Sequence, residues 1–362
     1  MTFDTQPAGS PTPAEPDHEQ VVIRQDPETG LRYIVAVHST VLGPSLGGLR
    51  LRRYPGGLRE ALEDVLGLAR TMTLKASAAG LDLGGGKSVM LDDGRGDARE
   101  ARLRAAARVI DGLGGAYITA EDIGTTTADM DLIAEHTRFV VGRSPEHGGA
   151  GDPSPVTAET VFQAIKRGLA AATGSAELEE RRVGVIGLGK VGAALAGKLA
   201  AAGAQVIGCD LVQDRAERFA AVHGGEPAPS AEAILALELD VLAPCAAGGL
   251  IDEAIARSLD CKVVAGAANN PLTNRGVAGT LAERGILCVP DFLANCGGLI
   301  HVESEWRKGG HDVVRARIGR AMERLDQAIE EAAAQGVTPI EVAERHALER
   351  VAAARAPVGA AA

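Results

Sequence analysis

Two lysines are the residues whose type and spacing point most directly to chemistry. Of the 37 basic residues in the chain, only seven are lysine and the others are arginine. A lysine can lose its proton at a workable pH when its surroundings lower its pKa, whereas an arginine cannot. A lysine retained in so arginine-rich a chain is therefore a candidate for substrate binding or proton transfer.

Lys75 and Lys87 stand twelve residues apart with no other basic residue between them, and Lys87 directly follows Gly84–Gly86. If the two side chains converge on one pocket, like-charge repulsion and desolvation would lower the pKa of at least one of them. One lysine could then hold a substrate carboxylate while the other acts as a general base. The alternative is a pair of solvated lysines at the edges of loops.

The run Gly84–Ser88 reads GGGKS, which looks like the end of a phosphate-binding P-loop. The full motif requires glycine at position 81, where this chain has Leu81. We therefore exclude a nucleoside-triphosphate site at this position. We expect the three glycines to lie in a loop and to let a ligand approach the backbone closely.

Polar side chains that follow other expected strands complete the set of candidates. Asp122 comes directly after the strand expected at 116–119 and could point into the same pocket, although it could instead cap a helix that begins near residue 128. Asn269, Asn270 and Asn295 follow two strands of the second half, where ligands of open α/β sheets bind. Their alternative role is turn formation.

Residues Gly187–Gly192 read GLGKVG and fit the dinucleotide fingerprint G-x-G-x-x-G. An apolar strand precedes the motif, a helix follows it, and Asp210 ends the next expected strand. Gly187 would make the tight turn, Gly189 would admit the pyrophosphate, and Gly192 would let the helix pack closely. Asp210 would bind the adenosine ribose and favour NAD over NADP, although Arg215 keeps NADP possible. The alternative is a glycine-rich turn in some other α/β fold.

The elements that must position these residues divide the chain into two halves. The first half contains a β-hairpin over 20–37, a helix over 58–72, a strand over 88–91, a helix over 98–113 and a strand over 116–119. The second half alternates strands and helices, which predicts a parallel sheet covered on both faces. Its expected strands are 182–186, 205–210, 240–243, 262–265 and 286–289, and the region 312–355 is expected to be helical with a break near 336–339.

The fold class is therefore α/β, with a Rossmann dinucleotide-binding domain, a second α/β substrate domain and a cleft between them. We expect a loose acidic tail over residues 1–18 and the substrate domain over 19–147. The dinucleotide-binding domain is expected over 148–335, beginning with a glycine-rich linker. The last helices, within 336–358, are expected to return to the first domain.

Composition narrows the class of function. The chain has 362 residues, 46% of them hydrophobic and 23% charged, as in ordinary globular proteins of about two domains. The net charge of −11 argues against general nucleic-acid binding. There is no apolar run long enough to span a membrane. Five dispersed cysteines favour reduced thiols over disulfides or a zinc site, so we expect a soluble, cytoplasmic protein without a metal.

Taken together and in order, the motifs resemble those of the Glu/Leu/Phe/Val dehydrogenase family, in its leucine/valine/phenylalanine branch. The resemblance covers about residues 18 to 350. The segments that carry it are Gly47–Arg50, Met72–Lys75, Gly84–Lys87, Asp122–Thr125, Ala128–Asp131, Gly151–Thr157, Ala243–Ala246, Ala267–Asn270 and Pro290–Gly298.

The resemblance implies reversible, NAD-dependent oxidative deamination of an L-amino acid to its 2-oxo acid and ammonia. It assigns Lys75, Asn295 and the Gly48 backbone to the substrate carboxylate, Lys87 to the base that activates water, and Asp122 to the substrate amine. It also implies a homo-oligomer, either a dimer or a larger assembly. The cofactor residues that it implies are Thr157, Gly187, Gly189, Lys190, Val191, Gly192, Asp210, Cys245, Ala246 and Asn269.

Four aliphatic positions match the side-chain pocket of the family: Leu46, Ala120, Leu299 and Val302. None could balance a second carboxylate, and Ala120 leaves less room for a ring than glycine, so we expect valine or leucine as substrate. The alternatives are a phenylalanine dehydrogenase and a non-catalytic NAD-binding regulator of the same fold. The chain departs from the family at Leu49, Ala76, Pro271 and Cys296, and several of these positions are expected to line or flank the cleft.

Overall fold

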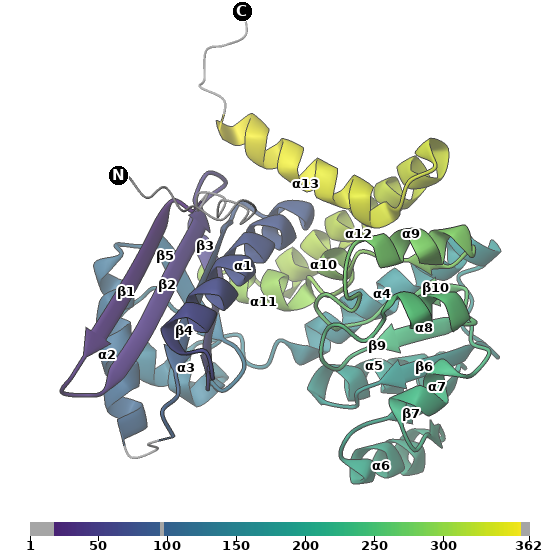
Figure 1. The fold of residues 1–362 in the computed structure, drawn as a ribbon, viewed down its shortest axis with the longest axis horizontal. Helices are drawn as coiled ribbons and strands as arrows, with labels where there is room; N and C mark the ends of the chain where they lie inside the picture. The colour runs from purple at the N-terminus through teal and green to yellow at the C-terminus, as the bar shows by residue number, and fades with distance from the viewer. Residues whose placement is uncertain (1–17, 95–97, 356–362) are drawn as a thin grey trace, which may run out of the picture.

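The computed structural model describes residues 18–94 and 98–355, which form two α/β lobes joined by a linker and by C-terminal helices (Figure 1). The tail expected at residues 1–18 lies, apart from His18, outside the described residues. Within the described ranges, no helix combines the length and apolar character needed to cross a membrane.

The first lobe is built on a five-stranded mixed sheet in the order β1-β2-β4-β3-β5. The hairpin β1–β2 is antiparallel, β2 pairs antiparallel with β4, and β3 runs parallel to both β4 and β5. The strands are β1 (Gln20–Asp26), β2 (Leu31–Ser39), β3 (Ser45–Arg52), β4 (Gly84–Leu91) and β5 (Tyr117–Glu121).

Helices cover both faces of this sheet, and two separate apolar clusters mark the two sides. On one face, α1 (Gly57–Ala78) packs on β2 and β4; on the other, α2 (Arg99–Gly112) contacts β2 and β5. A short helix, α3 (Thr127–Ala134), follows β5 and packs on α2. Because side chains alternate across a strand, each strand divides its residues between the α1 face and the α2 face.

One prediction for this lobe is wrong. Gly84–Gly86 are the first residues of the buried strand β4, so the expected glycine-rich loop does not reach them. These glycines are strand residues because Gly84, Gly85 and Gly86 are paired with β2 or β3 in the sheet. The absence of side chains on these glycines lets neighbouring backbone and side chains pack closely against β4.

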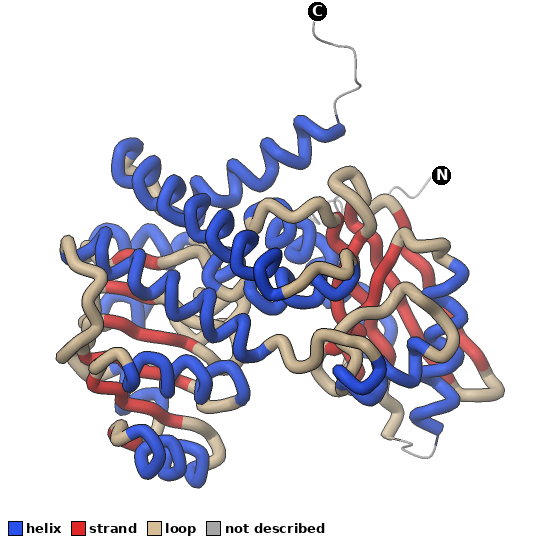
Figure 2. Tube along the Cα trace, turned by 180° about the vertical axis from the view of Figure 1, so that it is seen from behind, coloured by secondary structure: helices blue, strands red, loops and turns tan. Residues whose placement is uncertain are grey.

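The second lobe is a six-stranded parallel sheet in the order β11-β10-β9-β6-β7-β8, which confirms the Rossmann prediction. Helices cover both of its faces (Figures 1 and 2). The strands are β6 (Arg182–Ile186), β7 (Gln205–Cys209), β8 (Glu226–Pro227), β9 (Val241–Pro244), β10 (Val263–Val264) and β11 (Leu287–Cys288). The helices between them are α5 (Lys190–Ala201), α6 (Gln213–His223), α7 (Ala231–Leu235), α8 (Glu253–Ser258) and α9 (Gly276–Glu283).

A linker and several helices connect the lobes. The linker holds a 3-10 turn, η2 (Pro145–His147), and leads to α4 (Ser154–Thr173), which packs on α5 and on β10. After β11 come α10 (Asp291–Ala294), α11 (Gly297–Trp306), α12 (His311–Gln335) and α13 (Pro339–Arg355).

The last helix passes from the second lobe back over the first (Figure 1). It packs against α1, and Ser77 Oγ donates a hydrogen bond to the carbonyl of Ala347 at 2.8 Å. Arg350 reaches the carbonyl of Leu81 and the carboxylate of Asp82, both at 2.8 Å. The C-terminal helix therefore ties the second lobe to the loop that precedes β4.

Candidate active site

The polar candidates of the first lobe lie on the α1 side of its sheet. Along β3, Leu46, Gly48 and Arg50 alternate with Leu49, whose side chain belongs to the apolar cluster on the α2 side. Lys87 lies in β4, and Asp122 follows β5 directly. Because β3 is central between β4 and β5, these neighbouring strands bring Lys87 and Asp122 to either side of β3.

Two glycines make this approach possible. A Cβ on Gly48 would lie 2.6 Å from the Glu121 carbonyl oxygen and 2.7 Å from Asp122 Cβ, so a larger residue would displace Asp122. A Cβ on Gly85 would lie 2.1 Å from the backbone nitrogen of Thr73, so this glycine lets α1 rest against β4. Both glycines accommodate the protein itself, which corrects our expectation that the Gly84–Gly86 run serves ligand approach.

Lys87 and Asp122 form a buried ion pair. Lys87 Nζ lies 3.1 Å from Asp122 Oδ2, and the two side chains are only 7% and 21% exposed. Burial lowers the pKa of Lys87 below its ordinary value, and the cation of Arg50 lowers it further, against the opposing charge of Asp122. Burial alone would raise the pKa of Asp122, but Lys87 and Arg50 outweigh it and the pKa falls below the ordinary range. The alternative of a solvated Lys87 is excluded.

Lys75, in the last turn of α1, reaches across to the second lobe. Its Nζ donates a hydrogen bond to Asn269 Oδ1 at 2.9 Å. The same oxygen accepts a hydrogen bond from Asn295 Nδ2 at 3.1 Å. Burial lowers the pKa of Lys75, with a further contribution from the charge of Lys87 and opposition from Asp291. Each lysine thus has its own polar partner, Asp122 for Lys87 and Asn269 for Lys75, and their convergence on one substrate pocket stays a prediction.

Two alternatives left open by the sequence are resolved by the geometry. The N-cap of α3 is Thr126, which forms a capping box with Asp129, so Asp122 is free of that structural role. Asn270 has a φ of +49°, and its backbone N–H donates to Asp291 Oδ2 at 2.8 Å, so this asparagine does shape a turn. Asn269, in contrast, turns its side chain to Lys75, and Asn295 Nδ2 donates to Asn269 Oδ1 and to the Ala267 carbonyl.

Sequence reasoning missed an arginine and its two supports. Arg50 Nε donates to Asp122 Oδ2 at 2.8 Å, and Arg50 Nη1 lies 3.1 Å from Asp64 Oδ2. Tyr54 Oη donates to that same Asp64 oxygen at 2.7 Å. The available signal was the alternation along β3, which places Arg50 on the same side as Leu46 and Gly48.

The four predicted pocket residues are buried and belong to one apolar cluster shared by the two lobes. Leu46 and Ala120 come from β3 and β5, whereas Leu299 and Val302 come from α11. Leu49 lies on the opposite face of the sheet, so it is not among the departures from the family that flank the site. Cys296 and Ala76 are fully buried in the shared cluster, and burial raises the pKa of the Cys296 thiol to about 12.

The dinucleotide motif has the geometry that its glycines suggest. Gly187 has a φ of +101°, and a Cβ on it would lie 2.8 Å from the backbone nitrogen of Ala246. A Cβ on Gly192 would lie 1.9 Å from the Gly187 carbonyl oxygen, which explains the close packing of α5. A Cβ on Gly189, the N-cap of α5, would meet open space. The turn is therefore tight on the protein side and open where a pyrophosphate would lie, which fits NAD.

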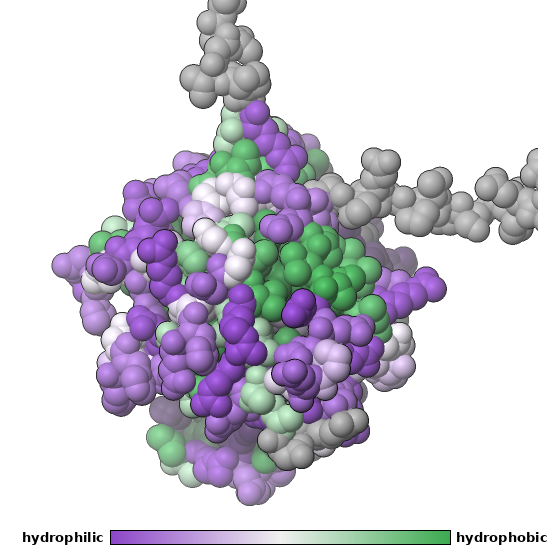
Figure 3. All heavy atoms as spheres, turned by 90° about the vertical axis from the view of Figure 1, so that its left-hand side faces the viewer, coloured by the Kyte–Doolittle hydropathy of each residue, from purple (hydrophilic) through white to green (hydrophobic). Residues whose placement is uncertain are grey.

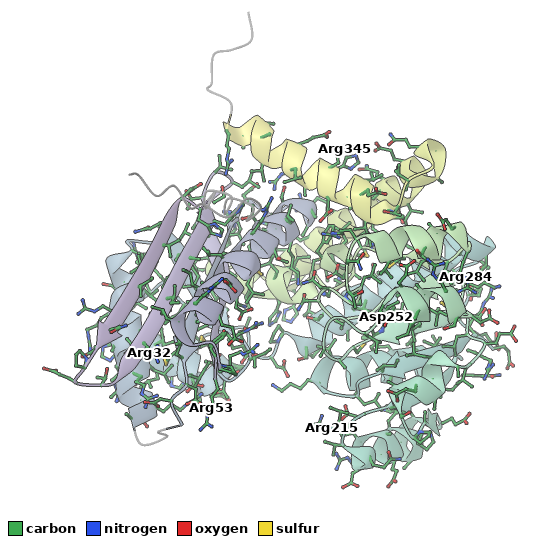
Figure 4. All side chains as sticks on the ribbon, viewed as in Figure 1. Arg32, Arg53, Arg215, Asp252, Arg284 and Arg345 are labelled. Atoms are coloured by element: carbon green, nitrogen blue, oxygen red, sulfur yellow. The ribbon has the colours of Figure 1, made fainter. Side chains whose placement is uncertain are left out.

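Asp210 follows β7 and is engaged with the motif itself. Asp210 Oδ2 accepts a hydrogen bond from the backbone of Leu188 at 2.8 Å, while Oδ1 accepts from the backbone of Val212 and from Arg215. Arg215 lies in the first turn of α6 in the second lobe (Figure 4). Burial would raise the pKa of Asp210, but these backbone hydrogen bonds and Arg215 lower it. Because the carboxylate accepts from the Leu188 backbone, it stabilises the glycine turn.

The other predicted cofactor residues surround the carboxyl ends of β6 and β9. Cys245 and Ala246 follow β9, and the backbone N–H of Cys245 donates to Ile186 at 2.7 Å. Lys190, mostly exposed, lies 3.6 Å from Asp152 of the linker, and Val191 follows it in α5. Thr157 lies in the first turn of α4, with its hydroxyl bonded to the Pro153 carbonyl.

Comparison with known proteins places the chain in a family. A model described as the Glu/Leu/Phe/Val dehydrogenase dimerisation domain matches residues 18–139, and a Glutamate/Leucine/Phenylalanine/Valine dehydrogenase model matches residues 210–359. The chain belongs to the Glu/Leu/Phe/Val dehydrogenase family. A model of the NAD binding domain of D-isomer specific 2-hydroxyacid dehydrogenases matches residues 159–245, so the second lobe is an NAD-binding domain of a dehydrogenase.

Several known proteins are similar to this chain over almost its whole length. Valine dehydrogenase from Streptomyces virginiae is 42% identical over 93% of this chain and 95% of its own length. Leucine dehydrogenase from Thermoactinomyces intermedius is 42% identical over 92% and 91%. The crystal structure of L-tryptophan dehydrogenase from Nostoc punctiforme matches with a TM-score of 0.81 at 33% identity, over 94% of this chain and 98% of that one.

Proposed function

We propose that the chain catalyses the reversible, NAD-dependent oxidative deamination of a branched-chain L-amino acid, valine or leucine, to its 2-oxo acid and ammonia. The observation that carries the proposal is the pairing of a buried Lys87–Asp122 ion pair with Lys75, which bridges to the NAD-binding domain. The valine and leucine dehydrogenases that resemble the chain over its length support the same reaction.

Substrate binding falls to Lys75 and its asparagine partners. In this proposal the ammonium group of Lys75 leaves Asn269 to bind the substrate carboxylate, and Asn295 with the Gly48 backbone completes that contact. Asn295 supports this role because its Nδ2 donates to Asn269 Oδ1, the atom that Lys75 also contacts, and would donate to a substrate carboxylate in that place.

Proton transfer falls to Lys87 and Asp122. With its lowered pKa, Lys87 can shed its proton and then activate the water that attacks the imine formed from the substrate. Asp122 remains an anion, orients the substrate amine and stabilises the positive charge that develops on the imine. The chemistry that NAD supplies when bound is acceptance of a hydride from the substrate Cα.

The cofactor would be held by the glycine turn of the second lobe. Gly187, Gly189 and Gly192 with the N-terminus of α5 would hold the pyrophosphate, and Asp210 would orient the adenosine ribose. Thr157 and Asn269 would lie near the nicotinamide, with Cys245 and Ala246 at the end of β9. Lys190 and Val191 would contribute the backbone of the turn.

The side-chain pocket supports an aliphatic substrate. Leu46, Ala120, Leu299 and Val302 are all buried and apolar, and none carries a charge that could pair with a second carboxylate. We further propose that the substrate domain comprises residues 19–147 together with the helices after 336, and that the dinucleotide domain comprises 148–335. The hydrogen bonds of α13 to Ser77 and Leu81 support this division.

We also propose that the chain forms a homo-oligomer through its first lobe. The edge strand β1 leaves Val21 and Ile23 37% and 48% exposed. The face of the molecule on that side carries a hydrophobic patch among mostly hydrophilic residues (Figure 3). The family model for residues 18–139 is described as a dimerisation domain, which supports an interface in this lobe.

Steady-state kinetics with a panel of amino acids tests the proposed reaction. The panel contains L-valine, L-leucine, L-isoleucine, L-phenylalanine, L-tryptophan and L-glutamate, each with NAD and with NADP. We expect the highest kcat/KM for valine or leucine with NAD. A preference for phenylalanine or tryptophan would favour an aromatic amino-acid dehydrogenase, and tight NAD binding with no turnover would favour a non-catalytic regulator.

A further inference from the structure

Arg50 shares one oxygen of Asp122 with Lys87. Lys87 Nζ lies 3.1 Å from Asp122 Oδ2, and Arg50 Nε lies 2.8 Å from the same atom. Among the described residues no hydrogen bond or ion pair reaches Asp122 Oδ1. One oxygen of the carboxylate is therefore fixed by two cations, and the other is left available.

The two cations differ in what they can do. Lysine can lose its proton in a buried site, whereas the guanidinium of arginine remains charged at every accessible pH. When Lys87 is neutral, Arg50 is thus the cation that still faces Asp122. An isolated carboxylate in a mostly buried position would otherwise take up a proton, because burial penalises its charged form.

Asp64 and Tyr54 hold the Arg50 side chain in place on the side away from Asp122. Its Nη1 lies 3.3 Å and 3.1 Å from the two oxygens of Asp64 on α1, and Tyr54 Oη donates to Asp64 Oδ2 at 2.7 Å. The Arg50 side chain is only 13% exposed. Arginine suits this position because its planar fork bonds Asp122 through Nε and Asp64 through Nη1 at once, which a lysine cannot do.

Resting on the proposed function, we propose that Arg50, braced by Asp64 and Tyr54, is a positioning residue. It keeps Asp122 ionised and turned with Oδ1 toward the substrate amine through the whole proton cycle of Lys87. Arg50 touches neither the substrate nor the reacting atoms in this account, and it acts only through Asp122 and through its charge.

The charges around Lys87 predict the direction in which each substitution shifts the pH at which Lys87 loses its proton. From β3 and β5 it faces Arg50 and Asp122, and from α1 it faces Asp64 and Lys75. The neighbouring β2 contributes His38, whose ring nitrogen Nδ1 lies 2.8 Å from Thr73 Oγ1. Loss of the Arg50 charge should let Lys87 hold its proton to higher pH, whereas loss of the Asp64 charge should release that proton at lower pH.

The test combines three variants with a matched control. Arg50→Met removes the positive charge near Lys87, and Asp64→Asn removes a negative charge. Arg50→Lys keeps the positive charge but lacks the planar guanidinium that bonds Asp122 and Asp64 at once. The control is Arg59→Met on the exposed face of α1, where Arg59 pairs with Glu63 and is 89% exposed. If Arg50→Met fails to fold, the other two variants still decide the question.

The main readout is the pH titration of Lys87 itself. With only seven lysines in the chain, NMR of lysine labelled with ¹³C at Cε gives few resonances, and Lys87→Arg identifies the one that matters. We expect the titration midpoint to rise by about one unit in Arg50→Met and to fall in Asp64→Asn. This readout requires no turnover, so it separates failure of the inference from failure of the proposed function.

Kinetics provides the second readout. We expect Arg50→Lys to lower kcat about tenfold while the midpoint of the pH profile stays within a few tenths of a unit, because the charge remains. Arg59→Met should match the wild type in both readouts. The inference is overturned if Arg50→Met and Asp64→Asn shift the Lys87 midpoint in the same direction, or if neither folded variant shifts it.

Discussion

Lys75 and Asn269 are 194 residues apart in the chain, yet Lys75 Nζ donates a hydrogen bond to Asn269 Oδ1 at 2.9 Å. This contact joins the end of α1 in the first lobe to the loop after β10 in the NAD-binding domain. It brings a residue assigned to the substrate carboxylate next to one assigned to the nicotinamide. In the proposed function, the two binding roles therefore meet where the lobes touch.

The first prediction concerns this lysine. Lys75→Met should raise KM for the amino acid about 10- to 100-fold, because a charge-assisted hydrogen bond to the carboxylate is lost. KM for NAD should change little. The melting temperature should stay equal or rise, since the lowered pKa of Lys75 means that its charge opposes folding. An unchanged KM for the amino acid would contradict the assignment of Lys75.

The second prediction concerns pH. The pKa of Lys87 lies below its ordinary value because of burial, so kcat/KM should rise with pH through that lowered pKa and fall again as Lys75 loses its charge. Stability should also rise with pH between the lowered and the ordinary lysine pKa, since the unfolded chain binds more protons there. Activity that is independent of pH across the alkaline range would exclude Lys87 as the base.

The third prediction concerns the side-chain pocket. Ala120→Gly should enlarge the space beside Leu46 and Val302 and shift the ratio of kcat/KM from leucine toward phenylalanine by about tenfold, as expected for one methyl group. Glycine in a strand should also cost about 0.5–1 kcal/mol of stability. The measurement is the ratio of the two kcat/KM values. A ratio that does not move would place Ala120 outside the pocket.

The fourth prediction concerns the close contact at Gly48. Gly48→Ala places a Cβ within 2.7 Å of Asp122 Cβ, so Asp122 must shift and kcat should fall at least about 100-fold. The control is Gly67→Ala on α1, where a Cβ meets no atom within 4 Å. That variant should keep its activity and gain about 0.5–1 kcal/mol of stability, measured by urea unfolding. Equal activity in both variants would contradict the role of this contact.

The fifth prediction concerns cofactor choice. Asp210→Ala removes the carboxylate that braces Leu188 and pairs with Arg215, so KM for NAD should rise at least about tenfold. Arg215 would then be released to meet a 2′-phosphate, and the preference for NAD over NADP should narrow. The measurement is kcat/KM for each cofactor. A preference that becomes stronger would show that Asp210 does not discriminate between them.

Much of the architecture was predictable from the sequence. The hairpin at 20–37, the alternating strands and helices after residue 180 and the break near 336–339 all follow from local pattern and turn residues. The helix expected over 58–72 is α1, which continues through Lys75, and Asp122 follows a strand as expected. These predictions needed only periodicity and the chemistry of glycine and proline.

The remainder depends on contacts between residues far apart in sequence. Gly84–Gly86 have the composition of a loop, and only the pairing of β4 with β2 and β3 makes them strand. Arg50 meets Asp64 and Asp122 only because α1 and β5 pack beside β3. Leu49 faces away from the site because its parity along β3 is opposite to that of Leu46. Alternation along β3 indicates which side chains share a face, but the elements that pack against that face are set by long-range contacts that no local pattern specifies.

The most direct test of the central claim compares NAD reduction by the wild type and by Lys87→Ala with L-valine and L-leucine. We predict that the wild type forms NADH with one or both substrates and that Lys87→Ala loses at least about 100-fold in kcat. The variant should bind NAD as tightly as the wild type and unfold at a similar temperature. A wild type that reduces no NAD with either substrate, or a folded Lys87→Ala variant within tenfold of wild-type activity, would contradict the account.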